Sequence, residues 1–465
     1  MAYPPSITFG MKSIRMGLSS RAFWAKNALF RKRAMAIYSQ ALLNESKSSD
    51  ELAEINWTKR RMIVTDAFEN SSFYKTFYQK EGFAPADLKS PSDWQYVPVL
   101  EKDHIRRFRE QILCRGTTPR DLIRTTTGGS TGLPLLSYRD ARFPEEIIKW
   151  RMLRRWAIAP EVDKLMLWRI PGKSNTWYAQ FLNAMIWWPT RRYKFDVSSI
   201  TSACLSEMER VLLERKPGIV WGYVGALQEL AEHLSSKGVT IDYSPLVWAT
   251  ASPMSRAQTE LFRRVFGPNI LDQYACSEIH WVASNVRDSR DLLVDFDYRH
   301  VDIVESESDG SEESGFGDLL LTDLENRAFP LIRYRNGDRS RWQTGRVPAA
   351  DGFPRMSPVM GRISDSLKTL SGRKVPGEYL TTIFDEHHRL VARFSILQKK
   401  NYSVEVRVQP SELALSNRQE LNEILEDVSG GLGQKLGEGA QVTYQIVDEI
   451  PHESGKFRFV KSELS

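Results

Sequence analysis

Short apolar strands alternate with helices through the middle of this 465-residue chain, and this alternation limits its fold more than any other feature. Strand-like runs lie at residues 164–170, 219–221 and 246–249, and helical patterns surround them at 145–156, 206–213 and 225–235. Strands that alternate with helices pair mostly in parallel, because each connecting helix packs back onto the sheet. The middle of the chain is therefore predicted to be α/β.

The pattern changes near residue 292. Short strands are expected at 301–304, 318–322 and 331–334, and the acidic, Ser/Gly-rich stretch 305–317 is interpreted as a solvated loop. Beyond Gly361, alternating runs at 404–408 and 442–447 flank a helical stretch at 418–428, which predicts a small α+β domain. We therefore expect three regions: helical residues 1–90, a large domain at 91–360 and a small domain at 361–465.

Residues 126–134 read Thr-Thr-Gly-Gly-Ser-Thr-Gly-Leu-Pro, and seven of the nine are glycine or hydroxyl residues. Glycines let the backbone approach a ligand closely, and amides with hydroxyls can donate to phosphate oxygens. The segment lacks the Gly-Lys-Ser/Thr ending of a P-loop. Taken alone it is either a phosphate-holding loop or an ordinary flexible turn.

Four further segments follow in order along the chain. They are Asp272–Glu278 (Asp-Gln-Tyr-Ala-Cys-Ser-Glu), Tyr334–Asp338 (Tyr-Arg-Asn-Gly-Asp, interpreted as a turn and an acid), Gly361–Lys368 followed by Ser371–Arg373, and Pro451–Arg458 (Pro-His-Glu-Ser-Gly-Lys-Phe-Arg). Each is weak alone. Together with the loop at 126–134, they form an ordered set that a chance match does not explain.

This ordered set resembles the adenylate-forming superfamily of acyl-CoA synthetases and adenylation domains. Residues 97–103 and 221–227 are similar to the phenylacetate-CoA ligase and capsule-biosynthesis CapK branch, and the resemblance covers roughly residues 90–465. It implies an α/β fold with a large N-terminal adenylate-forming domain of mixed sheets and helices. A small, mobile C-terminal α+β domain is expected to follow it.

The resemblance also implies a two-step reaction with ATP, Mg²⁺ and, as the expected acceptor, coenzyme A. A carboxylate attacks the α-phosphate of ATP, pyrophosphate leaves, and a thiol then displaces AMP to form a thioester. The implied enzyme is an AMP-forming acid–thiol ligase. An amine, hydroxyl or carrier-protein thiol is the alternative acceptor, and a catalytically silent scaffold for polysaccharide or natural-product assembly is the alternative from another class.

Specific residues carry these implied roles. Lys456 resembles the catalytic lysine of the small domain, and Glu278 resembles the carboxylate that holds Mg²⁺. Tyr274 resembles the aromatic residue that stacks on adenine, and Asp338 the acid that accepts the ribose hydroxyls. The remaining implied residues are those of the phosphate loop (Thr127, Gly128, Gly129, Ser130, Thr131, Gly132), the nucleotide contact Arg362, and the hinge Ser364 and Asp365.

Some positions depart from the family pattern. Leu135 stands where lysine is common, and Ser364-Asp365 replaces two consecutive acids at the hinge. Segment 250–253, Thr-Ala-Ser-Pro, lacks the acid that often precedes the proline. The stretch 279–300 contains two histidines but no cysteine, so no structural zinc is expected.

Three aromatic residues and one cysteine leave their roles open from sequence alone. Trp221, Tyr223 and Trp248 either line a pocket for the acid or pack in the core. Cys276 lies inside a nucleotide motif, but no motif pairs it with a histidine base, so we expect it to form part of the wall. The identity of the acid is not predicted.

The N-terminal 44 residues carry seven basic residues and no acid, with Trp24 and Phe30 among them. They fit a helix on an anionic membrane, an organellar presequence, or a helix docked on the main body or on another subunit, and docking is preferred. The net charge of +6 comes without any nucleic-acid-binding signature. Three scattered cysteines and no long apolar run favour a cytoplasmic protein. The oligomeric state is not predicted.

Overall fold

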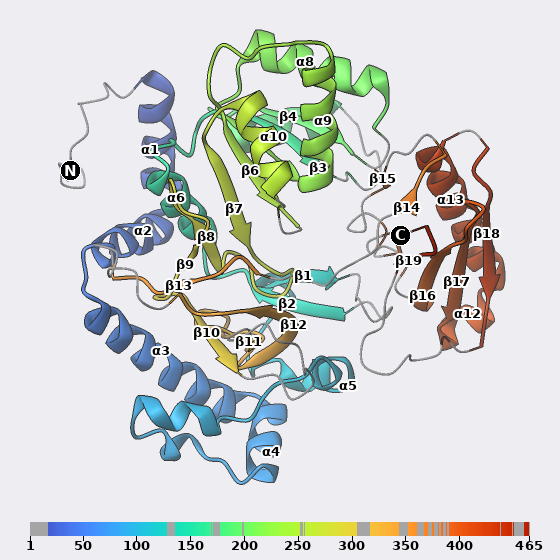
Figure 1. The fold of residues 1–465 in the computed structure, drawn as a ribbon. Coiled ribbons are helices and arrows are strands. Elements are labelled where there is room, and N and C mark those ends of the chain that lie inside the picture. The colour runs from blue at the N-terminus through green and yellow to red at the C-terminus, as the bar shows by residue number, and fades with distance from the viewer. Residues whose placement is uncertain are drawn as a thin grey trace.

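The structure of the protein is a computed structural model (Figure 1). It describes residues 17–127, 135–168, 170, 177–197, 200–251, 254, 256–304, 317–343, 352–359, 367–370, 374–375, 380, 383–384, 387, 390–437, 439–448, 450 and 460–464.

Helices form the N-terminal region. Each of two helical stretches is divided in two, the first into α1 Leu18–Phe30 and α2 Lys32–Asn44 and the second into α3 Ser49–Asn70 and α4 Ser72–Lys80. The second division occurs at Ser71, because its extended backbone ends α3 while its hydroxyl accepts from the amide of Tyr74 and begins α4. Ser48 and Glu51 form a capping box that begins α3.

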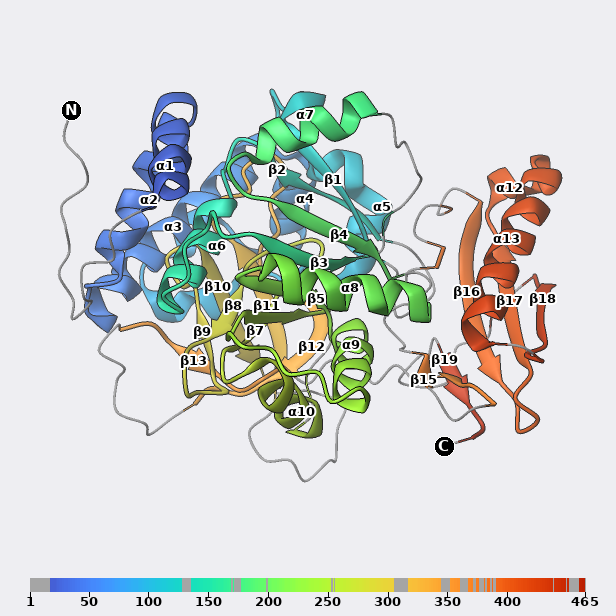
Figure 2. The same ribbon diagram turned by 90° about the horizontal axis from the view of Figure 1, so that it is seen from above.

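An eight-stranded sheet forms the centre of the large domain, in the order β13-β9-β8-β7-β6-β5-β3-β4 (Figures 1 and 2). Strands β3 to β7 pair in parallel, as the alternating pattern predicts, whereas β7, β8, β9 and β13 pair antiparallel. The bounds are β3 Lys164–Trp168, β4 Arg192–Asp196, β5 Ile219–Tyr223, β6 Leu246–Thr250, β7 Ile270–Tyr274, β8 Ala283–Asn285, β9 Leu292–Val294 and β13 Arg355–Met356.

Helices cover both faces of this sheet. One face packs on α8 Ser202–Arg215, α9 Val224–Ser236 and α10 Arg256–Phe266, and α6 Glu146–Arg155 packs on the other. Helix α7, Trp177–Trp187, lies between β3 and β4 in the chain. Packing on the α8–α10 side is tight at Gly222, where a Cβ added to the glycine would lie 2.5 Å from the Cβ of Leu167. Any larger residue there must displace β3.

A second, antiparallel sheet contains β10 Arg299–Val304, β11 Gly317–Asp323 and β12 Tyr334–Ser340. A hairpin of β1 Leu122–Thr127 and β2 Leu135–Asp140, with α5 Lys102–Ile112 beside it, completes this part of the domain. The chain between α4 and α5 holds the short 3₁₀ helices η1 Pro85–Asp87 and η2 Pro91–Tyr96, and η3 Pro119–Asp121 precedes β1. The largest buried cluster joins α3, α4, this sheet and the end of β7.

Strand β12 differs from the sequence expectation in a way that affects function. The sequence predicts a strand at 331–334 and a turn at 334–338, but the strand begins at Tyr334 and continues through Asp338. Pairing shifts between Asp318 and Leu320, which face Arg339 and Arg335, so three residues of β12 bulge opposite one residue of β11. Gly337 supplies the positive φ of 87° that the bulge contains.

The C-terminal region forms a small α+β unit with its own core, which lies beside the large domain in Figures 1 and 2. Its sheet has the order β18-β17-β16-β19, and a two-stranded pair precedes it. The elements are β14 Leu367–Lys368, β15 Lys374–Val375, β16 Val391–Gln398, β17 Val404–Pro410, α12 Glu412–Ser416, α13 Arg418–Leu436, β18 Val442–Ile446 and β19 Val460–Ser462. The predicted boundary near Gly361 lies outside the described residues.

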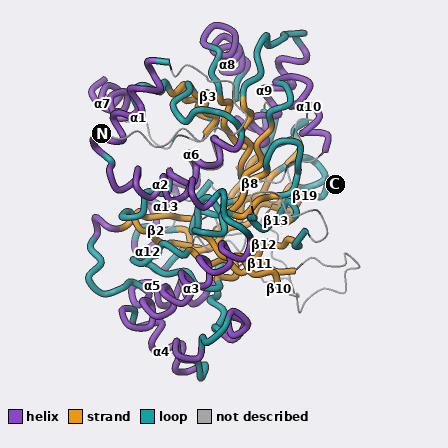
Figure 3. The backbone as a smooth tube through the Cα atoms, turned by 90° about the vertical axis from the view of Figure 1, so that its left-hand side faces the viewer, coloured by secondary structure: helices purple, strands orange, loops and turns teal. Residues whose placement is uncertain are grey.

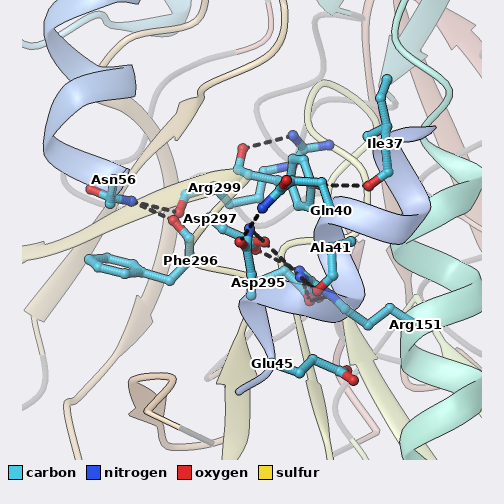
Figure 4. A network of polar contacts seen from close by, with 12 residues as sticks. Ile37, Gln40, Ala41, Glu45, Asn56, Arg151, Asp295, Phe296, Asp297 and Arg299 are labelled. Carbon is cyan, nitrogen blue, oxygen red and sulfur yellow. Dashed lines mark hydrogen bonds and ion pairs between the residues drawn. The ribbon is translucent and has the colours of Figure 1, made fainter. Parts of the chain in front are cut away.

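A buried ion cluster joins the N-terminal helices to the large domain (Figure 4). The guanidinium of Arg151 on α6 donates to Asp295 at 2.6 Å and to Asp297 at 2.7 Å, and all three side chains are fully buried. Asn44 at the end of α2 donates to Asp297 at 2.8 Å. Burial alone would lower the pKa of Arg151, but Asp297 and Asp295 raise that pKa well above its usual value. Removing one partner leaves a buried charge uncompensated, at a cost of about 3–5 kcal/mol.

Candidate active site

Tyr274 and Asp338, which are distant in sequence, meet at one edge of the large domain. Tyr274 ends β7, and its hydroxyl donates to Asp338 Oδ2 at 2.9 Å. Asn336 donates through Nδ2 to the Tyr274 hydroxyl at 2.7 Å and to Asp338 Oδ2 at 2.7 Å. The β12 bulge brings both Asn336 and Asp338 to Tyr274. Sequence reasoning missed Asn336, although it lies inside the Tyr334–Asp338 motif.

Glu278 lies in the turn that follows β7, and its side chain is buried. The hydroxyl of Tyr334, the first residue of β12, donates to Glu278 Oε1 at 2.8 Å. Tyr334 is fully buried, so it fixes one oxygen of the carboxylate. Sequence reasoning also missed this partner, because nothing in the Tyr334–Asp338 motif indicates that Tyr334 contacts Glu278. The Tyr334–Asp338 motif of β12 thus contacts the end of β7 and the turn after it at both of its ends, through Tyr334 to Glu278 and through Asp338 to Tyr274.

Burial sets the protonation state of the groups around this site. It raises the pKa of the Tyr274 hydroxyl well above its usual value, and the nearby Asp338 raises it further, so this hydroxyl remains a donor. Burial also raises the pKa of the Cys276 thiol well above its usual value, with Glu278 adding to the effect. A protonated thiol is a poor nucleophile, which agrees with Cys276 as a wall residue.

The predicted phosphate loop falls between two paired strands. Thr127, the last residue of β1, lies opposite Leu135, the first residue of β2. Leu135 is buried in the same cluster as Tyr274 and Tyr334, so this end of the hairpin is rooted in the core beneath the Tyr274–Asp338 contact. Gly128, Gly129, Ser130, Thr131 and Gly132 lie outside the described residues, as do Arg362, Ser364, Asp365 and Lys456. Their roles stay predictions.

The proposed pocket aromatics share one face of the parallel strands. Trp221 stacks on Trp248, with ring centroids 4.8 Å apart, and Trp168 packs edge-on against Trp221 and Tyr223 at 5.3 and 4.8 Å. Trp248 is fully buried, so its ring belongs to the core behind Trp221. Trp168 and Tyr223 lie at the carboxyl ends of β3 and β5. Ligands bind at this edge in open α/β sheets.

Polar groups near these rings lack partners within the part of the chain that the structure describes. The indole N–H groups of Trp168, Trp221 and Trp248 are buried and make no hydrogen bond there. The ammonium of Lys149 on α6 lies 5.9 Å from the Trp221 ring centroid, and burial together with the nearby Arg192 lowers its pKa to about 8. The sequence offered no motif that would have identified Lys149 or Trp168.

The two histidines of residues 279–300 have protein partners. His280 Nδ1 lies 3.7 Å from Glu145, and burial, together with Arg139 and Arg299, lowers the pKa of His280 to about 3. His300 Nε2 lies 3.2 Å from Asp302. No group of three or more metal-ligating side chains occurs among the described residues.

The residues present fit the cofactors that the motifs imply. Mg²⁺ prefers carboxylate oxygens, which Glu278 supplies in a buried position held by Tyr334. The tethered Tyr274 ring and the Asp338 carboxylate match the needs of a base and a ribose. An aromatic ring and an acid so placed, at the carboxyl end of a strand, suit a nucleotide.

Comparison with known proteins agrees with this geometry. Residues 367–463 match the family model of the CapK C-terminal domain. The phenylacetate-coenzyme A ligase of Escherichia coli (strain K12) is 22% identical over 433 residues, covering 89% of this chain and 95% of that protein. The phenylacetate-coenzyme A ligase of Aromatoleum evansii is 23% identical over 338 residues, covering 70% and 73% respectively.

Solved structures show the same fold. A 2-hydroxyisobutyryl-CoA ligase, in complex with 2-HIB-AMP and CoA in the thioesterification state, superposes with a TM-score of 0.61 at 18% identity, covering 90% of this chain and 92% of that one. The same ligase in the postadenylation state, in complex with 2-HIB-AMP, gives a TM-score of 0.57 at 18% identity, covering 90% and 91%.

The chain resembles the adenylate-forming ligases of the phenylacetate-CoA ligase and CapK-like branch. The family resemblance noted in the motifs is thereby confirmed. So is the predicted fold class, a mixed α/β large region followed by a C-terminal α+β domain. The predicted enzyme class, an AMP-forming acid–thiol ligase, is that of these relatives.

Proposed function

We propose that this protein activates a carboxylic acid as its acyl-adenylate and transfers the acyl group to coenzyme A. The observation that carries the proposal is the meeting of Tyr274, Asn336 and Asp338, with Tyr334 and Glu278 beside them. It unites two of the motifs that, in order, resemble adenylate-forming ligases. The similarity to the E. coli phenylacetate-coenzyme A ligase, along 89% of this chain, supports an acid–CoA ligase.

In the first half-reaction, a carboxylate oxygen attacks the α-phosphorus of ATP, and the bond to the pyrophosphate oxygen breaks. Asp338 holds the ribose, because its Oδ2 is fixed by two donors and the carboxylate can accept from the sugar hydroxyls. Tyr274, tethered at its hydroxyl, presents its ring to adenine. Both contacts exist before and during bond formation, so they contribute mainly to nucleotide affinity.

Glu278 is the residue that would hold Mg²⁺, and Tyr334 orients it. The metal supplies neutralisation of the phosphate charge that builds up during attack. Lys456 is proposed to stabilise the same charge, together with the donors of the Gly128–Gly132 loop. Arg362 is proposed to contact the nucleotide near the hinge at Ser364 and Asp365.

In the second half-reaction, the thiol sulfur attacks the acyl carbonyl carbon, AMP leaves, and the thiol loses its proton. Reorientation of the small domain between the two steps is proposed from the family resemblance. Trp221 and Tyr223 are proposed to contact the apolar part of the acid at the carboxyl edge of the sheet. Trp248 supports Trp221 from behind.

The decisive experiment is a panel of carboxylic acids assayed for pyrophosphate release with ATP and Mg²⁺, with and without coenzyme A. We expect at least one acid to give release that the Glu278→Ala variant loses, and a thioester only when coenzyme A is present. Release that needs an amine or a carrier protein would show that this molecule, and not coenzyme A, is the acyl acceptor. No acid-dependent release by the folded protein, across a broad panel, would remove the activity.

A further inference from the structure

One helix of the large domain leaves an unusual amount of apolar surface open. Within α7 and the residue that follows it, the large apolar side chains of Tyr178, Phe181, Leu182, Met185, Ile186, Trp187 and Trp188 are all exposed, Ile186 by 65%. Isolated exposed apolar residues are common on proteins, but a contiguous group of this size marks a contact surface. Figures 2 and 3 show α7 at the periphery, near α1.

The end of α7 is anchored to the N-terminal helix. Lys26 of α1 donates through Nζ to the backbone carbonyls of Met185, Ile186 and Trp188 at 3.3, 2.6 and 3.0 Å. A cation at the carboxyl end of a helix satisfies its free carbonyls and favours its dipole. Leu29 and Phe30, one turn beyond Lys26, are 65% and 76% exposed, so they extend the open apolar surface.

The surroundings of this surface are positively charged. Residues 17–44 and 177–195 together contain eight basic residues and no aspartate or glutamate. Arg192 lies over the Trp187 ring at 4.0 Å. These cations lower one another's pKa values. Burial and the neighbouring Arg31 lower the pKa of Lys26, and burial and Arg192 lower the pKa of Lys194. The nearby acid Glu146 already pairs with Arg31.

We infer that α7, with the adjoining end of α1, docks on an anionic lipid surface. Aromatic and aliphatic side chains enter the boundary between headgroups and chains, while the surrounding Lys and Arg residues meet the lipid phosphates. At 11 residues, α7 is about 16 Å long, which is too short to span the hydrocarbon core of a lipid bilayer, about 30 Å thick. The helix therefore lies along the membrane–water interface. Among the helices of the described residues, none has the length and apolarity that a crossing requires.

Two other occupants fit less well. A second copy of the chain, placed by a two-fold axis on this surface, would bring two sets of cations together. An acidic protein helix would need a groove to receive it, whereas nearly every residue of α7 that follows Gln180 is exposed and the helix projects as a ridge. A ridge of mixed aromatic and aliphatic residues flanked by cations suits a fluid, negatively charged surface.

Vesicle co-sedimentation of the full-length protein tests the inference. We expect binding to vesicles of phosphatidylcholine mixed with phosphatidylglycerol, little binding to phosphatidylcholine alone, and weaker binding at high salt. The double variant Phe181→Ser/Ile186→Ser should bind about tenfold less or weaker, because two inserted apolar side chains are lost. Both side chains are exposed, so the melting temperature should change little.

The matched control is Leu213→Ser/Leu413→Ser, which removes two exposed apolar residues from α8 and α12. Its binding should remain within about twofold of the parent protein. Equal losses in the two double variants would overturn the inference. So would equal binding of the parent to both kinds of vesicle. A parent dimer that Phe181→Ser/Ile186→Ser converts to a monomer, without vesicle binding, would assign the surface to a second copy instead.

Discussion

The nucleotide edge and the aromatic face of the same large domain are built in contrasting ways. At the nucleotide edge, the hydroxyls of Tyr274 and Tyr334 each hold an acid at 2.8–2.9 Å, and Asn336 adds further donors. On the aromatic face, three buried indole N–H groups have no partner in the described part of the chain. The first region is complete before a ligand arrives, whereas the second still has donors to offer.

This difference indicates where specificity lies. Under the function proposed above, the first region binds the same nucleotide whichever acid is activated, so it can be preorganised at low cost. The acid differs between the relatives, and the indole N–H groups of Trp168 and Trp221, which lack partners in the described residues, are donors that a particular acid can satisfy. We therefore expect changes at the two regions to separate, one acting on ATP and rate and the other on the choice of acid.

The largest effect is expected from Lys456→Ala. It should lower adenylation by about 10²-fold or more while MgATP still binds, because a cation is removed from developing charge. Acid-dependent pyrophosphate exchange measures it, with Lys461→Ala on β19 as the matched lysine control. Exchange near the parent rate in Lys456→Ala would exclude this lysine from the chemistry.

Glu278→Ala and Asp338→Ala should each cost about 10- to 100-fold, but in different constants. Asp338→Ala should mainly raise KM for ATP, since the ribose contact exists before reaction, and Glu278→Ala should mainly lower kcat and raise the Mg²⁺ requirement. Steady-state kinetics over ATP and Mg²⁺ concentrations separate the two. The same pattern in both variants at saturating Mg²⁺ would contradict the division of roles.

Asp272 lies on β7, two residues before Tyr274. Burial raises its pKa to about 6, and the attraction of Arg290 offsets this rise only in part. The folded state then holds an extra proton between about pH 4 and 6, so Asp272 makes the protein less stable as pH rises through that window. Asp272→Asn should remove this slope and stabilise the protein by about 3 kcal/mol at pH 7. Denaturant unfolding at several pH values checks it, and parallel curves for both proteins would refute it.

Tyr334→Phe should lower kcat by up to about tenfold and raise the Mg²⁺ requirement, because one hydrogen bond to Glu278 is lost while the buried ring remains. The matched change Tyr274→Phe should act instead on KM for ATP, because it removes one of the two hydrogen bonds that fix Asp338 Oδ2. Kinetics of both single variants, and of each combined with its acid partner's substitution, give the coupling. Additive effects of Tyr334→Phe and Glu278→Ala would show that Tyr334 does not act through Glu278.

The smallest effect on KM for ATP is expected from a substitution on the aromatic face. Trp221→Leu should change the relative rates for different acids by about 3- to 10-fold and leave KM for ATP unchanged, since β6 separates β5, which carries Trp221, from β7, which ends at Tyr274. A panel of acids measured with both proteins decides it. An increase in KM for ATP matching the loss in rate would mean that the two regions are one site.

The sequence predicted the fold class and two partners of the nucleotide edge, because the information there is local. Tyr274 and Asp338 were identified because each lies in a short segment that resembles a family motif, whereas the bulge that brings them together was not predicted. Tyr334 and Asn336 were missed because their roles depend on contacts with residues 56 and 62 positions away. The prediction of a turn at β12 is wrong because Asn-Gly-Asp has turn chemistry, and only pairing with β11 makes it a bulge.

The N-terminal helices illustrate a second limit. Docking was preferred on the expectation that Trp24 and Phe30 both pack on the main body or on another subunit. Trp24 stacks on Tyr38 and meets Trp150 at 5.5 Å, but Phe30 is 76% exposed. Helical periodicity offered no way to distinguish the two residues, since the partner surface comes from α6. Exposed apolar residues on α7 were likewise not distinguishable from core residues in the sequence.

The contact between Asn44 and Asp297 has a consequence for synthesis of the chain. The first helices leave the ribosome early, yet Trp150 follows its partner Trp24 by 126 residues and Asp297 follows its partner Asn44 by 253 residues. At about 5–20 residues per second, Asn44 waits roughly 13–50 s for its partner. Until Trp150 has been synthesised, Trp24 also lacks that ring, which it contacts in the folded protein. The polar contact between α2 and the large domain therefore forms only after most of the large domain has been synthesised.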